Sequence, residues 1–208
     1  ADIVSVDHED AVAALVRDLR GRGAGNLVFI GFRGSGLPSE RLREKAFRAL
    51  AAPGDRIVTI PWGRKIEPEV ARLVADLREE GVFAGEPAGE RGERGGGTDG
   101  RGEGGTGWSG GGTVEPVGCS GPVGLIGCNG PVGLAAAKAV RALGLEDRCR
   151  LAAIDLLPEM EEYRMTAYRQ PMKELAETAY RRLAAQCNEG EYWRARQFLL
   201  CGEVVRFG

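Results

Sequence analysis

Hydrophobic residues in this chain form short unbroken runs that alternate with stripes at helical spacing. Residues 26–31 (NLVFIG) and 123–128 (VGLIGC) are almost wholly apolar, which is typical of parallel strands covered on both faces. Between such runs, apolar residues recur every three or four positions, as on one face of a helix. The first of these stripes consists of Val12, Leu15, Val16 and Leu19.

The alternation extends along the whole chain, apart from one glycine-rich segment. Strands are predicted over residues 3–6, 26–31, 56–60, 123–128, 150–154, 165–168, 197–200 and 203–207. Helices are predicted to begin near Asp7, Ser39, Pro68, Pro131 and Pro171, because these residue types favour helix starts. Alternating strands and helices indicate an α/β fold with a mainly parallel sheet and helices on both faces. Ligands of such sheets bind at the carboxyl ends of the strands, so we look for a site in the loops that follow them.

The glycine-rich segment interrupts this pattern before the strand at 123–128. Residues 85–112 contain 14 glycines in 28 positions, and Arg, Glu, Thr and Ser supply most of the rest. Such a composition buries too little apolar surface to offset the entropy lost on ordering. The sequence therefore predicts a disordered insertion at 85–112 within one ligand-binding lobe, which residues 1–84 and 113–208 form.

Charge and composition exclude several classes of function. The 28 basic and 30 acidic residues leave a formal net charge of -2, so the chain lacks the basic surface typical of nucleic-acid binding. No apolar run approaches the ~20 residues of a membrane span, and the first residues do not resemble a signal peptide. Five cysteines without C-x-x-C spacing and one histidine disfavour a zinc site. We expect free thiols, a cytoplasmic location and no metal.

Motifs for catalysis or nucleotide binding are weak. Residues 31–36 (GFRGSG) and 127–133 (GCNGPVG) each lie between a strand and a helix, where glycines can cradle a phosphate. Neither matches the dinucleotide motif G-x-G-x-x-G or the P-loop, and ordinary turn glycines explain both. His8 stands alone near the N-terminus, and the nucleophile motif G-x-S-x-G is missing. We therefore expect a binding protein without a cofactor, and a nucleotide-binding enzyme domain remains an alternative.

Polar and aromatic residues follow several of the predicted strands. Trp62, Asn129, Asp155 and Gln170 each come just after a strand, and Arg43 lies one turn into a helix. An aromatic ring covers the apolar face of a sugar, while guanidinium, amide and carboxylate groups pair with its hydroxyls. Three of them also have a structural explanation: Trp62 as the edge of the core, Asp155 as a helix cap and Arg43 as a surface residue. The pattern favours a cleft for a polar small molecule.

Six segments resemble the effector-binding domain of the lactose/galactose repressor (LacI/GalR) family. They are VDHEDAVAALVRDLRGRGAGNLVFIGF, SERLREKAF, IGCNGPVGLAAAKAVRALGL, LAAIDLLPE, TAYRQPMKELAETAYRRL and LCGEVVRF. The resemblance implies a periplasmic-binding-protein-like fold whose ligand cleft is lined by Arg43, Trp62, Asn129, Asp155 and Gln170. It also implies a sugar-like effector, a homodimer, and DNA binding only through a module that this chain lacks.

The sequence departs from the family at two positions of the expected cleft. Gly130 and Leu156 stand where the family usually has aspartates. The helix-turn-helix and most of the first lobe also have no counterpart here, so we expect a fragment that begins at the crossover into the second lobe. A solute-binding protein of a transporter shares this fold and is the main alternative to a transcriptional regulator.

Overall fold

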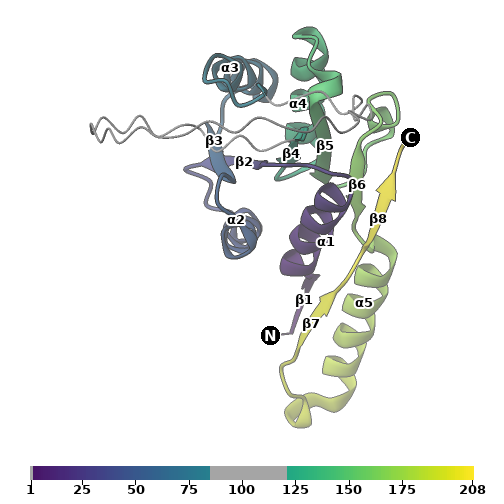
Figure 1. Cartoon of the computed structure of the whole chain (residues 1–208). Coiled ribbons are helices and arrows are strands. Elements are labelled where there is room, and N and C mark those ends of the chain that lie inside the picture. Colours follow the sequence, from purple (N-terminus) through teal and green to yellow (C-terminus); the bar gives the residue numbers. More distant parts are fainter. Residues whose placement is uncertain (1, 85–120) are drawn as a thin grey trace, which may run out of the picture.

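A six-stranded sheet forms the centre of the molecule. A computed structural model describes residues 2–84 and 121–208; the predicted insertion at 85–112 and Cys119 lie outside the described residues. The strands of the sheet, in spatial order, are β3 (Arg56–Pro61), β2 (Leu27–Arg33), β4 (Val123–Gly127), β5 (Cys149–Ile154), β6 (Thr166–Arg169) and β8 (Glu203–Arg206) (Figure 1). The first five run parallel and β8 is antiparallel to β6, which confirms the predicted mainly parallel sheet.

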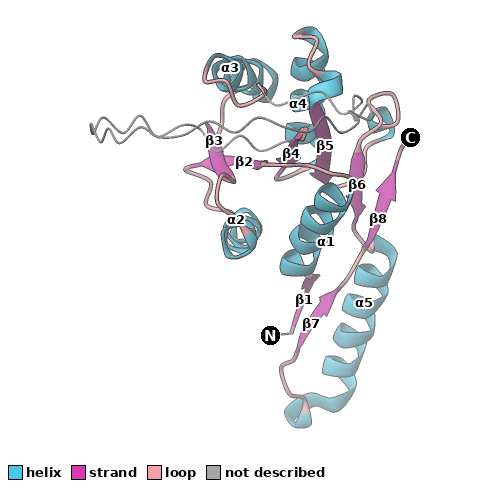
Figure 2. Ribbon diagram, viewed as in Figure 1, coloured by secondary structure: helices cyan, strands magenta, loops and turns pink. Residues whose placement is uncertain are grey.

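Four helices cover the two faces of this sheet. They are α1 (His8–Gly21), α2 (Pro38–Leu50), α3 (Ile66–Glu79) and α4 (Gly130–Ala142). Figure 2 shows α1 and α2 on one side of the sheet and α3 and α4 on the other. Buried apolar side chains fill both layers, and Phe29 on β2 stacks on Phe47 of α2 with ring centroids 5.2 Å apart. The predicted arrangement of helices on both faces is confirmed.

Two of the five predicted helix starts carry side-chain caps and three do not. The Asp7 carboxylate accepts hydrogen bonds from two backbone amides in the first turn of α1, and Oδ1 of Asn129 caps α4 by accepting one from the backbone amide of Val132. The prediction that Ser39 caps the second helix is wrong, because α2 begins at Pro38 after Leu37. Proline has the φ of a first helical turn and no N–H that needs a cap, so this helix can begin without one.

The glycines of the loop at 127–133 let α4 approach the sheet closely. A Cβ atom on Gly127 would lie 2.3 Å from the backbone nitrogen of Gly133, and one on Gly133 would lie 2.4 Å from the Cβ atom of Ala153. No side chain fits at such distances. Both glycines are therefore required for packing α4 against β4 and β5, whatever the loop binds.

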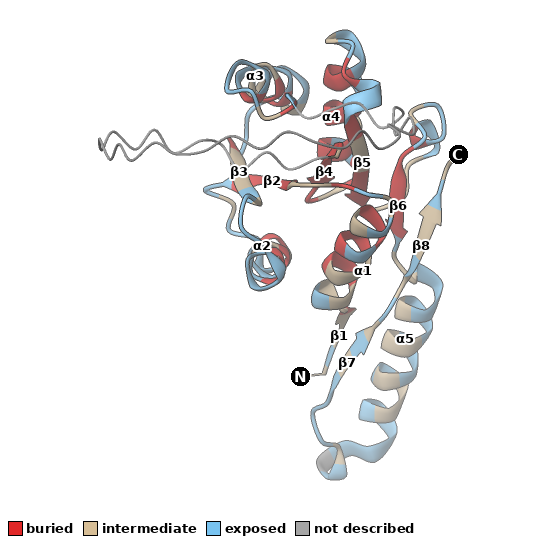
Figure 3. Ribbon diagram, viewed as in Figure 1, coloured by how far each residue is buried: buried red, intermediate tan, exposed pale blue. Residues whose placement is uncertain are grey.

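A smaller unit stands beside the main sheet. Its strands β1 (Ile3–Val6) and β7 (Gln197–Leu200) match the predicted segments but pair only with one another, in parallel. Helix α5 (Met172–Glu189) packs on β1, and none of its residues is buried (Figure 3). Met172, Tyr180 and Leu183 form an apolar stripe on α5 and are 65%, 74% and 63% exposed. Short 3-10 turns complete the described fold at Glu146–Arg148, Pro158–Met160 and Gly190–Tyr192.

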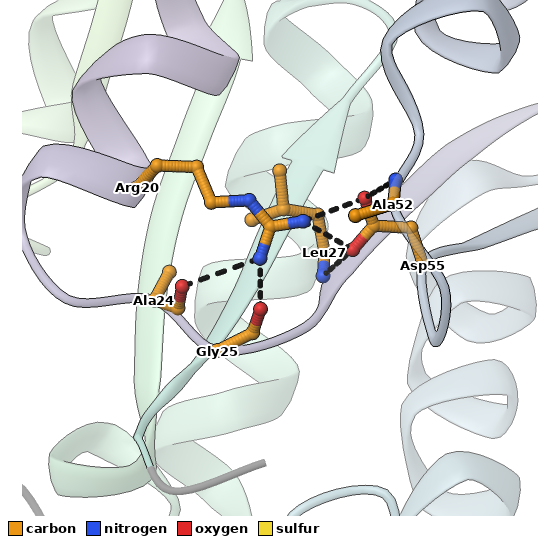
Figure 4. A network of polar contacts seen from close by, with 6 residues as sticks. All are labelled: Arg20, Ala24, Gly25, Leu27, Ala52 and Asp55. Atoms are coloured by element: carbon orange, nitrogen blue, oxygen red, sulfur yellow. Dashed lines mark hydrogen bonds and ion pairs between the residues drawn. The ribbon is translucent and has the colours of Figure 1, made fainter. Parts of the chain in front are cut away.

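An ion pair fixes the amino edge of the main sheet (Figure 4). Nη2 of Arg20, at the end of α1, donates to both carboxylate oxygens of Asp55 at 2.7 and 2.6 Å. The same carboxylate accepts from the backbone amides of Leu27 and Ala52, each at 2.7 Å. Asp55 thereby joins α1, the start of β2 and the turn before β3. This network lies at the edge opposite the strand ends where a ligand site is predicted.

Candidate ligand-binding site at the carboxyl edge of the sheet

The five parallel strands end at one edge of the sheet, and four of the predicted site residues lie there. Trp62 follows β3, Asn129 follows β4 after one residue, Asp155 follows β5 and Gln170 follows β6. The strand order places the ends of β4, β5 and β6 next to one another. Asn129, Asp155 and Gln170 therefore occupy neighbouring positions along this edge.

Arg43 reaches this edge from α2. Its Nη1 atom donates a hydrogen bond of 2.8 Å to the carbonyl oxygen of Cys128, which directly precedes Asn129. The Arg43 residue is only 5% exposed, and Nη1 lies 3.9 Å from Oε1 of Glu40. The explanation of Arg43 as a surface residue is therefore wrong. A guanidinium buried at a strand end is a strong hydrogen-bond donor held in a fixed orientation.

Asp155 has an unusual backbone conformation. Its φ is +81°, in the left-handed region that only glycine, asparagine and aspartate adopt readily. The Gln170 side-chain amide donates to Oδ1 of Asp155, and the Asp155 backbone amide donates to the carbonyl of Tyr168 at 3.0 Å. A Cβ atom on Gly130 would lie 3.4 Å from Cβ of Asp155. These contacts join Asp155, Gln170 and the start of α4 in one cluster.

His8 belongs to the same cluster and was missed by the sequence reasoning. Nε of Arg43 donates to its Nδ1 atom at 3.4 Å. Burial lowers the pKa of His8 and the Arg43 charge lowers it further, while the Asp7 and Asp155 carboxylates act in the opposite direction. The signal that could have found it is its position, because His8 comes two residues after β1 just as Asn129 comes two residues after β4.

Trp62 lies apart from the other four predicted residues. Its ring packs edge-on against Phe32, with centroids 4.9 Å apart, and it is 48% exposed. In the strand order, β2 lies between β3, which Trp62 follows, and β4. The structure thus brings Arg43, Asn129, Asp155 and Gln170 together and leaves Trp62 at the end of the edge strand, with an open aromatic face.

Two hollows adjoin the cluster. Asp155 and Gln170 line a pocket of about 830 Å³ together with the apolar side chains of Leu156, Pro171 and Met172. A second pocket, of about 440 Å³, is lined by Gln170, Met172 and His8 with residues of β1 and α5. The larger pocket therefore combines apolar side chains with several charged ones, because it is also lined by Arg169, Lys173, Glu174, Glu177 and Glu203.

The two departures from the family pattern place apolar groups in this region. Leu156 lines the larger pocket, at a position where the family that the chain resembles usually has a second carboxylate. The Leu157 side chain occupies the space that a side chain at Gly130 would need, since a Cβ atom there would approach it to 3.0 Å. Neither position therefore supplies the carboxylate that the family pattern implies.

The chemistry of the cluster suits binding by hydrogen bonds. Burial is the main cause that raises the pKa of the Cys128 thiol far above its ordinary value, so this cysteine stays protonated. Oε2 of Glu40, buried beside it, has no hydrogen-bond partner. Residues 2–84 and 121–208 contain no group of three or more histidine, cysteine or acidic side chains that could hold a metal. They also include no helix long and apolar enough to cross a bilayer.

Comparison with known proteins identifies the fold. A model of the periplasmic binding protein-like domain matches residues 16–206. Similar solved structures include a xylose-binding transcription activator, at 16% identity and a TM-score of 0.66, where the match covers 97% of this chain and 46% of that one. A dimeric Lac repressor with a C-terminal deletion matches at 18% identity and a TM-score of 0.62, covering 97% and 61%.

A transport protein has the same fold. The periplasmic solute-binding protein of an ABC transporter from Actinobacillus succinogenes, solved with D-allose, matches at 16% identity and a TM-score of 0.62, covering 98% of this chain and 60% of that one. No curated protein sequence matches the chain. The chain thus spans between about half and three fifths of the length of these three structures. At such identities the likeness shows the fold alone, so the function has to be inferred from the residues of the site.

Proposed function

Because the chain belongs to the periplasmic binding protein-like domain family, we propose that it is the effector-binding domain of a transcriptional regulator of the lactose/galactose repressor type. Its ligand is a sugar-like polar small molecule, bound by Arg43, Trp62, Asn129, Asp155 and Gln170. The observation that carries this proposal is the cluster at the strand ends, where Arg43 reaches Cys128 next to Asn129, and Asp155 pairs with Gln170. Solved regulators with this fold support it.

The ligand would lie between two lobes, of which this chain supplies one. Residues 1–84 and 113–208 are the proposed lobe, and the insertion at 85–112 is outside the proposed site. The exposed stripe on α5 supports a missing partner surface, because large exposed apolar patches commonly mark interaction sites. We propose that this unit packs against further chain of the same protein. DNA binding would come from a separate module, and the regulator would act as a cytoplasmic homodimer.

A solute-binding role in transport is the second candidate. The Actinobacillus succinogenes protein, solved with D-allose, favours it. The gene sequence before Ala1 separates the two candidates, since a helix-turn-helix supports the regulator and a secretion signal supports the transport protein. Neither candidate requires a cofactor or catalysis.

Ligand binding is tested by thermal unfolding and calorimetry with lactose, D-xylose and D-allose, on the chain and on the full-length product of its gene. A ligand at 100 times its Kd stabilises the native state by about 2.7 kcal/mol. We expect at least one sugar to stabilise the protein, and we expect Gln170→Ala to weaken that binding while Arg72→Gln, on the exposed surface of α3, leaves it unchanged. Binding that is equally strong in both variants would contradict the proposed site, and a lack of binding to any sugar would contradict the ligand class.

A further inference from the structure

His8 sits where α1 meets the candidate site, and its position is fixed from both sides. It is the first residue of α1, directly after Asp7, whose carboxylate caps the helix with hydrogen bonds of 3.0 and 2.9 Å. On its other side, Nε of Arg43 donates to Nδ1 of His8 at 3.4 Å. Since Nη1 of Arg43 donates to the Cys128 carbonyl, two acceptors from two different elements hold the guanidinium.

This arrangement requires a particular form of the imidazole. Arginine has only donors and stays charged in proteins, so the atom that accepts from Nε must carry a lone pair. His8 is therefore neutral here, with its proton on Nε2. A protonated imidazole would offer a second N–H to the guanidinium and add a like charge beside it. Protonation of His8 and the contact with Arg43 exclude one another.

The charges around His8 come from three elements. Arg43 lies on α2 and lowers the pKa of His8 after the larger effect of burial, while Asp7 before α1 and Asp155 after β5 raise it. Glu40, also on α2, lies 3.9 Å from Arg43 at Nη1. Only His8 and the Cys128 carbonyl accept from Arg43 within hydrogen-bond distance in the described chain. Because the carbonyl cannot titrate, His8 is the acceptor that responds to pH.

We propose that His8 is a positioning residue of the cleft: its neutral imidazole fixes the Arg43 guanidinium at the strand ends, and effector binding weakens when the imidazole is protonated. The link to the effector rests on the proposed function, whereas the link between His8 and Arg43 exists in the protein without ligand. Loss of one hydrogen bond to a charged group corresponds to a reduction in affinity of about tenfold to a hundredfold.

The link to Arg43 is tested first, without ligand, by NMR of the whole chain. His8 is the only histidine, so its imidazole signals report its protonation directly, and an Arg43→Lys spectrum assigns the Arg43 Nε–H signal. We expect His8 to titrate below pH 6.5, as the direction of its pKa shift requires. The Arg43 signal should change with the same midpoint. If the Arg43 signal does not change as His8 titrates, the inference is overturned, whether or not any sugar binds.

Two variants separate positioning from a merely structural role. His8→Asn places an amide oxygen near the position of Nδ1 and cannot titrate, so it should keep the Arg43 signal unchanged from pH 5 to 8. His8→Leu removes the acceptor and should lose that signal at every pH. Thermal unfolding tests whether each variant is folded. If a variant is not folded, the titration of the wild-type protein still tests the inference. If His8→Leu keeps the Arg43 signal as well as His8→Asn does, the inference is overturned.

The link to the effector is tested with the three sugars named above. Wild-type affinity should fall about tenfold or more as the pH drops through the His8 midpoint, and His8→Asn should bind with little pH dependence. Affinity that does not follow the midpoint, while the Arg43 signal does, overturns this half of the inference. If no sugar binds at any pH and the NMR link holds, the proposed function fails and the positioning contact stands.

Discussion

The positive φ of Asp155 leads to a specific order of stabilities among its variants. A left-handed conformation costs about 1–2 kcal/mol for a residue with a Cβ atom and no local hydrogen bond, as in Asp155→Ala. Glycine avoids this cost but gives the unfolded chain more conformational freedom, which lowers the stability of the glycine variant by about 0.4–1 kcal/mol. Asp155→Gly should therefore be about 1 kcal/mol more stable than Asp155→Ala, although both lose the hydrogen bond from Gln170.

Asp155→Asn tests the contribution of charge separately. Asparagine tolerates the same φ and keeps an oxygen that can accept from Gln170, so it should be the most stable of the three variants. A hydrogen bond to a charged group contributes about 1.5–3 kcal/mol, against about 1 kcal/mol for a neutral pair. We expect Asp155→Asn to lose about 1 kcal/mol and Asp155→Ala about 3 kcal/mol relative to wild type.

Urea unfolding monitored by circular dichroism measures these differences, with an unchanged m-value as the sign that only stability has changed. A change of 1 kcal/mol corresponds to a shift in Tm of about 2–4 °C for a domain of this size. If Asp155→Ala proves as stable as Asp155→Gly, the left-handed conformation of residue 155 is refuted. Asp155→Asn as unstable as Asp155→Ala would refute the contact with Gln170.

Three further predictions concern packing, thiol reactivity and the rim of the site. Gly133→Ala should destabilise the protein by about 1–3 kcal/mol in urea unfolding, because its Cβ atom would lie 2.4 Å from that of Ala153; unchanged stability would contradict the close packing of α4. Cys149 should react with a thiol reagent only after unfolding, since it is buried and burial raises its pKa to about 12, whereas the exposed Cys187 should react at once. Trp62→Ala should weaken sugar binding in calorimetry yet shift Tm by only a few degrees, because the ring is half exposed and packs on Phe32 alone among aromatic side chains of the described chain; a large loss of stability would assign Trp62 to the core.

The sequence was sufficient for elements whose signals are local. Unbroken apolar runs located β2 and β4 to within two residues, because a strand buried on both faces leaves no polar position along its length. The strand-end rule then predicted that Asn129, Asp155 and Gln170 lie at one edge of the sheet, without knowledge of their contacts. It found them because topology alone brings the carboxyl ends of parallel strands to one edge.

Features that depend on tertiary contacts could not be predicted in this way. Arg43 resembles a surface residue in a helical pattern, and only the distance to Cys128 shows that it is buried. The φ of Asp155 leaves no trace in the sequence, since aspartate also occurs in ordinary turns. The separation of β1 and β7 from the main sheet was hidden as well, because a short apolar run gives no information about which strand it pairs with.

The chain crosses between the small unit and the main sheet three times, so three segments join the two units. The crossings run from β1 to α1, from β6 to α5 and from β7 to β8, so any change in the angle between the two units must be absorbed there. His8 lies on the first crossing and Gln170 on the second, and both line the 440 Å³ pocket. At the third, Gly202 donates its backbone N–H to the Tyr168 hydroxyl, which itself donates to Asp10 of α1 at 2.8 Å.

Two residues of the candidate site, His8 and Gln170, thus lie on the crossings between the two units. A ligand shifts a conformational equilibrium only by the difference in its affinity for the two states. A ligand held by Asp155 and Arg43 contacts only the main sheet and α2 and has no such difference, whereas one that also binds Gln170 contacts a crossing that must absorb any change in the angle. If the proposed function holds, Gln170→Ala should therefore reduce the coupling between effector and DNA in the full-length protein more than it reduces effector affinity. Asp155→Asn should do the opposite, and equal effects of the two variants on coupling would refute this division of roles.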